Sequence, residues 1–400
     1  MANVYRHILT DVDTSVYEDM WSLSPADLEL GGDHEWSVLK TTLWGGLQDG
    51  VELVEVDNGA LSFAIVPTRG MGIWKAQYRD ILLGWDSPVK GPVHPQFVDL
   101  YARGGLGWLY GFDEWIVRCG LDNNGAPGPD VIVDNNGNEA EVDLPLHGRI
   151  ANLPAQYVEV QVTLEPPYTI RVIGVVDEAM MFGPALRLTT CIATELGAPE
   201  FTISDTVQNL GDTPAELELL YHCNYGSPIL EEGARLVAPI REVAPRDPRA
   251  AEDMDTFDRY GAPEPGFVEQ AYFFDLLSDE TTGETGVLLK NADGNAASYL
   301  KFSKKQLPYF TQWRNTDGSR DGYVTGLEPA TNYPNAKRFE RDQGRVVSIP
   351  PGESYAVQLT VGACDTAERV QEQEAWIQGL QGDTQPVVHA SAIAKFSSIE

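Results

Sequence analysis

Residues 51–66 read VELVEVDNGALSFAIV, two β-rich runs on either side of Asn58 and Gly59. An Asn-Gly pair in this position predicts a β-hairpin, because both residues tolerate the positive φ that a type I′ turn requires. Similar runs recur between turn residues at 157–164, 169–176, 185–194, 201–208, 216–224, 285–289, 298–302, 345–349 and 355–361. This pattern is typical of an antiparallel β protein.

Helical patterns are few. Residues 369–380 follow the capping-type sequence DTAE at 365–368 and precede Gly382, which predicts a C-terminal helix within 365–382. For residues 24–46 we expect a short helix or irregular structure. We therefore expect an all-β chain that forms a single domain over 1–400, with two large antiparallel sheets, few short helices, and residues 1–50 as an N-terminal cover.

The charge excludes several classes of partner. The chain has 28 Lys and Arg against 60 Asp and Glu, a formal net charge of −32. Such an acidic protein repels phosphate backbones and anionic lipids, so we expect neither nucleic acid nor a membrane as partner. No run approaches 18 apolar residues, and the N-terminus lacks the apolar segment of a secretory signal.

The positions of the cysteines and lysines exclude several kinds of site. The four cysteines are scattered without a C-x-x-C pair, so we expect reduced thiols and a cytoplasmic protein rather than a zinc or redox motif. No lysine occurs between Lys90 and Lys290, which excludes a Schiff-base lysine there. Neither G-x-x-x-x-G-K-[ST] nor G-x-G-x-x-G occurs, so nucleotide binding lacks its usual support.

Two of the six histidines stand in sequences that suggest chemistry. In ELELLYHCN, residues 216–224, strand alternation places His222 and Asn224 on the same face. They could face a polar ligand or could be structural at a sheet edge, and this pattern alone favours neither. His147 lies in LPLHGR, residues 144–149. For the other four we expect surface or turn positions: His7, His34, His94 and His389.

Other polar residues form weaker candidates. Glu328 precedes Pro329, which we expect to end its strand, so that the carboxylate could project into a pocket or into solvent. Gln312 and Trp313 are a pair suited to hold a sugar, since an indole packs on C–H groups and an amide bonds hydroxyls; a core tryptophan is the alternative. Arg69 directly follows the hairpin and could bind a ligand, with a surface ion pair as the alternative.

In this order the motifs resemble those of the aldose 1-epimerase (galactose mutarotase-like) superfamily, in particular its DUF4432 branch. The motifs are PTRGM (67–71), RCGL (118–121), LHGR (146–149), YHCNY (221–225) and GLEP (326–329). The resemblance extends over about residues 51–361 and implies a β-supersandwich fold. A typical mutarotase has His-Gly-Gly where this chain has His147-Gly148-Arg149, and its histidine–asparagine strand is matched only in part.

The resemblance implies a role for each candidate residue. Glu328 would be the general base, His222 the acid that protonates the ring oxygen, and His147 a histidine that positions the ring oxygen or O1. The implied sugar-binding residues are Arg69, Arg118, Arg149, Asn224, Gln312 and Trp313. Arg149 could tighten hydroxyl contacts or indicate an acidic sugar.

The expected function is aldose 1-epimerase-like interconversion of the α and β anomers of a free sugar or sugar acid. One acid and one base suffice for this reaction, so we expect no metal and no cofactor. A carbohydrate-binding or sensing protein without turnover is one alternative, because a fold does not determine a function. A lyase or hydrolase on the same scaffold is another, and the oligomeric state is left open.

Overall fold

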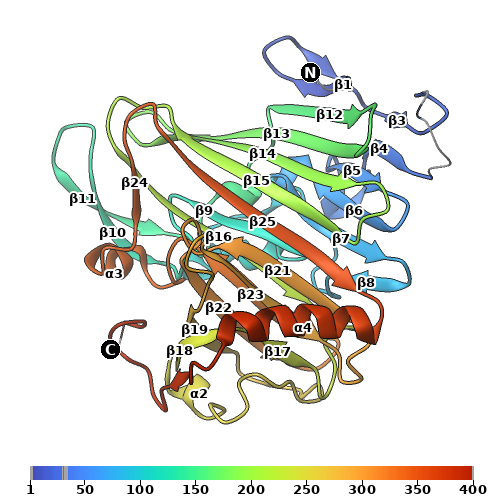
Figure 1. Ribbon diagram of the computed structural model, residues 1–400. Coiled ribbons are helices and arrows are strands. Elements are labelled where there is room, and N and C mark those ends of the chain that lie inside the picture. Colours follow the sequence, from blue (N-terminus) through green and yellow to red (C-terminus); the bar gives the residue numbers. More distant parts are fainter. Residues whose placement is uncertain (1–2, 29, 31–34, 399–400) are drawn as a thin grey trace.

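The computed structural model describes residues 3–28, 30 and 35–398, and its two large sheets pack face to face (Figure 1). The first sheet runs in the order β17 (Arg235–Val237), β20 (Glu284–Lys290), β21 (Ala297–Ser303), β25 (Ser354–Cys364), β15 (Glu200–Asn209), β14 (Ala185–Glu195), β13 (Thr169–Ala179), β12 (Tyr157–Thr163), β1 (Val4–Asp11) and β2 (Val16–Tyr17).

The second sheet carries most of the candidate residues. Its order is β26 (Val387–Val388), β18 (Ile240–Pro245), β19 (Gln270–Leu276), β22 (Tyr309–Thr316), β23 (Tyr323–Ala330), β16 (Ala215–Tyr225), β9 (Ile116–Leu121), β7 (Gly72–Tyr78), β6 (Leu61–Val66), β5 (Glu52–Asp57), β4 (Ser37–Thr42) and β3 (Trp21–Leu23). In addition, β24 (Val347–Ile349) pairs with β16, and β8 (Ile81–Leu83) pairs with β7. A separate hairpin consists of β10 (Gly128–Val133) and β11 (Glu139–Leu144).

The helices are short apart from the last one. They are α1 (Ala102–Gly105), α2 (Pro248–Ala251), α3 (Lys337–Asp342) and α4 (Ala367–Gln381), with 3₁₀ turns η1 (Gly46–Gln48), η2 (Pro67–Arg69), η3 (Pro95–Phe97), η4 (Gly107–Gly111) and η5 (Ile150–Asn152). The expected C-terminal helix is confirmed as α4, whose Thr366 side chain accepts the N–H of Arg369. None of the described helices is long and apolar enough to cross a membrane.

The expected all-β architecture of two antiparallel sheets is confirmed, and one large core lies between them. Strands β13 and β14 alternate buried and half-exposed residues, as strands with one face on a core do. Across the interface, Phe63 of β6 packs on Phe201 of β15 with ring centroids 4.8 Å apart. A buried side chain of this size contributes about 1.5–3 kcal/mol.

Two local expectations need correction. The hairpin forms, but Asp57 pairs with Ser62, and φ is positive at Gly59 and not at Asn58, so the turn is not type I′. Instead the Asn58 side chain accepts the backbone N–H groups of Ala60 and Leu61. Residues 37–42, expected as helix or irregular, form β4 because they pair with β5. The described part of residues 1–50 adds β1 to the first sheet and β3 and β4 to the second.

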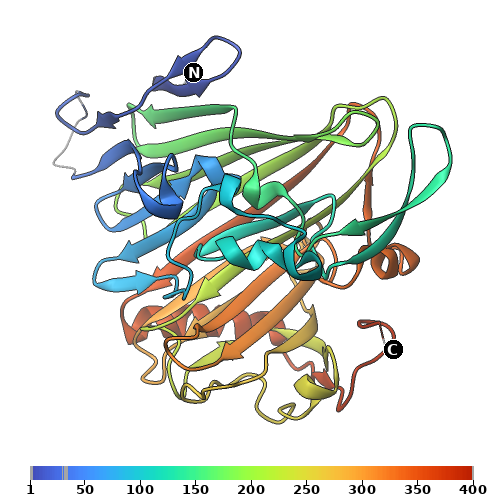
Figure 2. The same ribbon diagram turned by 180° about the vertical axis from the view of Figure 1, so that it is seen from behind.

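The centre of the second sheet is buried on both faces. Every residue of β23 is buried, as are nearly all residues of β16. The face away from the core is covered by residues 85–115, which cross in front of the sheet in Figure 2. Their apolar side chains pack on the sheet residues Val117, Cys119, Leu220 and Ala330. A polar group on this covered face is therefore shielded from bulk water.

Candidate functional site

His222 and Glu328 meet on the covered face of the second sheet. The antiparallel register of β16 and β23 pairs Leu220 with Ala330 and Asn224 with Gly326, and therefore places His222 opposite Glu328. The Nε2 atom of His222 lies 3.1 Å from Oε1 of Glu328. Strand β23 continues through Pro329 to Ala330, so the proline does not end the strand as expected.

Gly326 makes room for this pair. A Cβ atom at Gly326 would lie 2.6 Å from Oε1 of Glu328 and 2.8 Å from Cε1 of His222. Real Cβ contacts essentially never come this close. The GLEP motif thus supplies both the carboxylate of Glu328 and, at Gly326, the space that the His222 ring needs beside it.

Asn224 fixes the orientation and tautomer of His222. The Nδ2 group of Asn224 donates to the carbonyl oxygens of Glu114 and His222, so its Oδ1 is the acceptor that faces His222. Nδ1 of His222 lies 2.5 Å from this oxygen and must carry the proton. Nε2, the nitrogen near Glu328, is then free to take or release a proton.

Burial disfavours charge on both members of the pair. It raises the pKa of Glu328 well above its usual value, an effect that Glu269 adds to, and it lowers the pKa of His222 to about 3. In the free protein the proton of this pair is therefore favoured on Glu328, and Nε2 of His222 is unprotonated. The contact does not yet have hydrogen-bond geometry, since Oε1 has no aligned partner among the described residues. Catalytic contacts are often loose before substrate binds.

His147 lies beside the pair. Its ring centroid is 5.5 Å from that of His222, and its Nδ1 is 2.7 Å from the carbonyl oxygen of Asn124. Its backbone has φ of 59°, the left-handed region that a histidine seldom adopts. Burial lowers the pKa of His147 to about 4, so the ring is neutral at pH 7.

Aromatic rings enclose His222. The ring centroids of Phe112, Trp313 and Trp108 lie 5.2, 5.4 and 6.2 Å from that of its imidazole. Trp108 and Phe112 come from the segment over the sheet, and our sequence analysis missed both. The aromatic-rich run GWLYGFDEW at 107–115 was the available signal.

Strand alternation corrects the expected role of Gln312. Because Gln312 and Trp313 are neighbours on β22, their side chains point to opposite faces. Gln312 faces the core, where its Nε2 donates to Phe257 O and Tyr260 Oη. Thr311, two residues before Trp313, is paired with Glu328 and is the β22 residue beside it. The period-2 pattern could have identified Thr311 from the sequence.

Buried polar atoms at this site lack partners. Among the described residues, Glu328 Oε1, Thr311 Oγ1 and Trp108 Nε1 are buried without a hydrogen bond. Such atoms are rare in native proteins and call for an explanation, for example a bound molecule. Together they offer an acceptor and two donors, a set that suits a ligand with several hydroxyl groups.

The rim of the site carries one cation between two carboxylates. Trp313 Nε1 donates to Glu269 Oε2 at 2.7 Å, and Arg246 donates to the other oxygen of Glu269 at 3.1 Å. Arg246 also donates to Asp247. Its positive charge is thus opposed by two carboxylates. Neither Glu269 nor Arg246 stood out in the sequence, because neither belongs to a motif.

Arg118 does not join the site. It lies on the core side of β9, where its Nε and Nη2 donate to Asp205 at 2.5 and 3.0 Å. Its other N–H groups donate to Gly70 O, Met71 O and Thr190 Oγ1. All five donors are used, so the expected contact with a sugar is wrong for Arg118.

Arg69 and Arg149 also lie outside the set of residues around His222 and Glu328. Arg69 is fully buried, with Nε 2.5 Å from Glu114 Oε1, and it donates to Val93 O, Asn152 Oδ1 and Gly111 O. Arg149 is exposed. Burial raises the pKa of Glu178, at the end of β13, to about 7, and the charge of Arg149 opposes this shift.

The described residues contain no group of three or more His, Cys, Asp or Glu that could hold a metal ion. His34 lies outside the described residues, whereas His7, His94 and His389 lie away from the pair, in contact with Glu18, Gln96 and Glu242.

Comparison with known proteins agrees with the fold. The model of a family described as a domain of unknown function, DUF4432, matches residues 48–363. A solved structure described as a putative aldose 1-epimerase from Klebsiella pneumoniae is 34% identical, with a TM-score of 0.90 over 96% of this chain and 98% of that one. A search of curated proteins finds no match.

More distant structures share the fold alone. A galactose mutarotase-like protein from Clostridium acetobutylicum has 15% identity and a TM-score of 0.54 over 87% of this chain and 99% of that one. A putative aldose 1-epimerase from Escherichia coli K12 has 13% identity and a TM-score of 0.51, over 78% and 99%. The resemblance inferred from the five motifs is confirmed, as is the galactose mutarotase-like fold.

Proposed function

The chain belongs to the DUF4432 family, and we propose that it is an aldose 1-epimerase-like isomerase that interconverts the α and β anomers of a free sugar. The observation that carries this proposal is the buried pair of His222 Nε2 and Glu328 Oε1, 3.1 Å apart. The ring oxygen and the anomeric oxygen are bonded to the same carbon, so two adjacent groups reach both of them.

In the proposed reaction the pair returns to its starting proton count. The reaction begins when the proton of the pair moves from Glu328 to His222. The Glu328 carboxylate then takes the proton of the anomeric hydroxyl, while Nε2 gives its proton to the ring oxygen. The C1–O bond of the ring breaks and a C1 aldehyde forms. After rotation about C1–C2, the new hydroxyl attacks the other face of the aldehyde. His222 then takes that hydroxyl's proton, and Glu328 protonates the carbonyl oxygen.

The surroundings support a neutral sugar rather than a sugar acid. Arg69 and Arg118 are bonded to buried carboxylates, Arg149 is exposed, and Arg246 is opposed by Asp247 and Glu269. A carboxylate on the substrate would thus find no uncommitted cation in Arg69, Arg118 or Arg246. Phe112 and Trp313 supply apolar faces for the C–H side of a sugar ring.

Exchange NMR between α and β anomers tests the activity across a panel of neutral aldoses and uronic acids. We expect catalysed exchange for at least one neutral aldose. Glu328→Gln and His222→Asn should each lower kcat/KM by about 10²–10⁴, because each removes one proton-transfer group. Glu353→Gln, the same change at an exposed turn residue, is the matched control and should not alter the rate.

Other outcomes would favour the alternatives. Binding of a sugar without any acceleration of exchange would favour a binding or sensing protein. Cleavage of a glycosidic bond that depends on Glu328 would favour a hydrolase. Full exchange activity in Glu328→Gln would contradict the proposed mechanism.

A further inference from the structure

A second cross-strand pair on the same face of β16 and β23 lies four residues from the catalytic pair. The register that places His222 opposite Glu328 also brings Glu218 opposite Asn332, just beyond the end of β23. Asn332 Nδ2 donates to Glu218 Oε1 at 2.8 Å. Both side chains are fully buried. Polar groups at this depth need hydrogen-bond partners, and both side chains have them.

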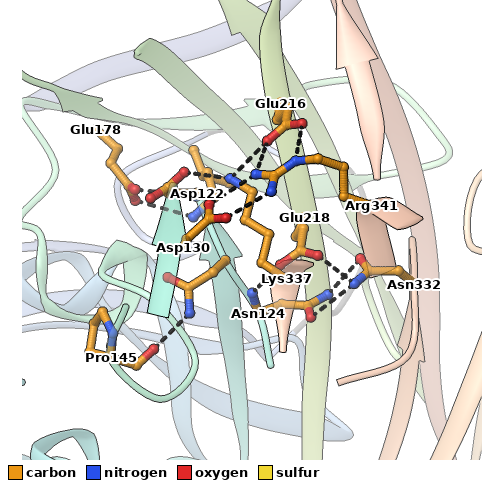
Figure 3. Close-up of polar contacts among 12 residues, drawn as sticks. Asp122, Asn124, Asp130, Pro145, Glu178, Glu216, Glu218, Asn332, Lys337 and Arg341 are labelled. Atoms are coloured by element: carbon orange, nitrogen blue, oxygen red, sulfur yellow. Dashed lines mark hydrogen bonds and ion pairs between the residues drawn. The ribbon is translucent and has the colours of Figure 1, made fainter. Parts of the chain in front are cut away.

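This second pair holds the residue that bonds His147. Figure 3 shows Glu218 and Asn332 converging on Asn124: Glu218 Oε2 accepts the backbone N–H of Asn124 at 3.1 Å, and Asn332 Oδ1 accepts its Nδ2 at 3.0 Å. The carbonyl oxygen of Asn124 in turn accepts from Nδ1 of His147. The chain of bonds runs from Glu218 to Asn124 to His147.

The carbonyl oxygen determines which nitrogen of His147 carries the proton. A carbonyl only accepts, so Nδ1 is the donor, and Nε2 on the other edge of the neutral ring is an acceptor. An acceptor cannot hydrogen-bond the ring oxygen of a sugar, which has no proton. It can accept from a sugar hydroxyl.

We propose that Glu218 and Asn332 are positioning residues that fix His147 as a hydrogen-bond acceptor, so that His147 binds a hydroxyl of the sugar and not its ring oxygen. The second half of this statement rests on the proposed function, whereas the tautomer of His147 is a property of the free protein. The two halves are therefore tested separately.

Histidine ¹⁵N NMR of the full chain reports the tautomer, with His147→Gln to assign the signals. We expect protonation of His147 at Nδ1 in the wild type and an appreciable Nε2–H fraction in Glu218→Leu and Asn332→Ser. Each change removes a hydrogen bond to Asn124 and should lower kcat/KM about tenfold, mainly through KM.

The matched control is Arg341→Gln. Arg341 lies in the same polar network, where its hydrogen bonds within the described part of the chain go to Asp130 and Glu216 and not to Asn124 (Figure 3). The Arg341→Gln variant should be less stable than the wild type but should keep the wild-type His147 tautomer and kcat/KM. Nε2 protonation in the wild type would overturn the proposal, as would an unchanged tautomer in both folded variants.

A carbasugar tests whether His147 binds a hydroxyl group of the sugar or its ring oxygen. It keeps the hydroxyls of its parent sugar but has carbon in place of the ring oxygen. We expect His147→Gln to weaken binding of the carbasugar and of the parent sugar by the same factor. A loss of affinity seen only with the parent sugar would assign His147 to the ring oxygen and overturn this part. If no sugar binds at all, the proposed function fails, while the tautomer result stands.

Discussion

Gly326 and the pair beside it illustrate how single residues determine this site. His222 and Glu328 can approach to 3.1 Å because Gly326, two residues before Glu328 on the covered face of β23, has no side chain. Asn224 then selects the tautomer of His222, and burial favours the uncharged forms of both His222 and Glu328. The close approach thus depends on the missing side chain of Gly326, and the tautomer of His222 depends on the side chain of Asn224.

Gly326→Ala should separate the pair. Its Cβ would press on Glu328 Oε1 and His222 Cε1, both buried and unable to move into solvent. We expect kcat/KM to fall at least about tenfold and the free energy of unfolding to fall by about 1–3 kcal/mol, the usual cost of overpacking. Anomer-exchange rates and urea unfolding measure these. Gly128→Ala, in a strand with open space around the glycine, is the control; equal rates in both variants would refute the steric argument.

At the scale of elements, the segment over the second sheet depends on one buried ion pair. Arg69, at the end of η2, bonds Val93, Gly111 and Glu114, which belong to that segment. The same segment carries Trp108 and Phe112 to the catalytic pair. The arginine that the resemblance assigned to the sugar thus supports the cover of the site.

Arg69→Met should destabilise the protein strongly. It leaves Glu114 buried without its partner, which costs about 3–5 kcal/mol. Urea unfolding should show this loss. The double change Arg69→Met with Glu114→Met should recover part of it, because no unpaired charge is then buried. A single variant with wild-type stability would show that the ion pair does not hold the segment.

At the scale of the whole molecule, several buried carboxyl groups stay protonated in the folded state at pH values where they are ionised in the unfolded chain. Burial raises the pKa of Asp113 and Glu218 to about 8 and that of Glu178 to about 7. Glu328 is shifted in the same direction. The folded state therefore binds more protons than the unfolded state between about pH 4.5 and 8. His147 and His222, shifted to about 4 and 3, oppose this below about pH 6.5.

The sign of the pH dependence follows. Above pH 6.5 the histidines are neutral in both states, and only the buried acids contribute, so stability should fall as pH rises toward 8. We expect a loss of at least about 2 kcal/mol between pH 6.5 and 8, measured by urea unfolding. Surface repulsion from the net charge of −32 would also act in this direction. Salt at about 0.5 M screens surface charges but not buried ones, so a loss that disappears in salt would contradict our explanation.

Local patterns determined a large part of this protein from its sequence. Strand periodicity and turn residues predicted the antiparallel sheets, and alternation alone placed His222 and Asn224 on one face, because both follow from backbone geometry within a few residues. Alternation also excludes Gln312 and Trp313 from a common face. Which face of a strand is covered is not a local property, so Gln312 and Arg118 were assigned to the wrong side.

Only the tertiary structure decided what the motifs do together. His222 and Glu328 are more than a hundred residues apart in sequence, and the register of β16 on β23 makes them a pair. The same register aligns Glu218 with Asn332 behind His147. The sequence alone specified the residue types and their periodicity. The physical reason for the difference is that proton affinity and tautomer depend on burial and on the nearest partners, which long-range packing supplies.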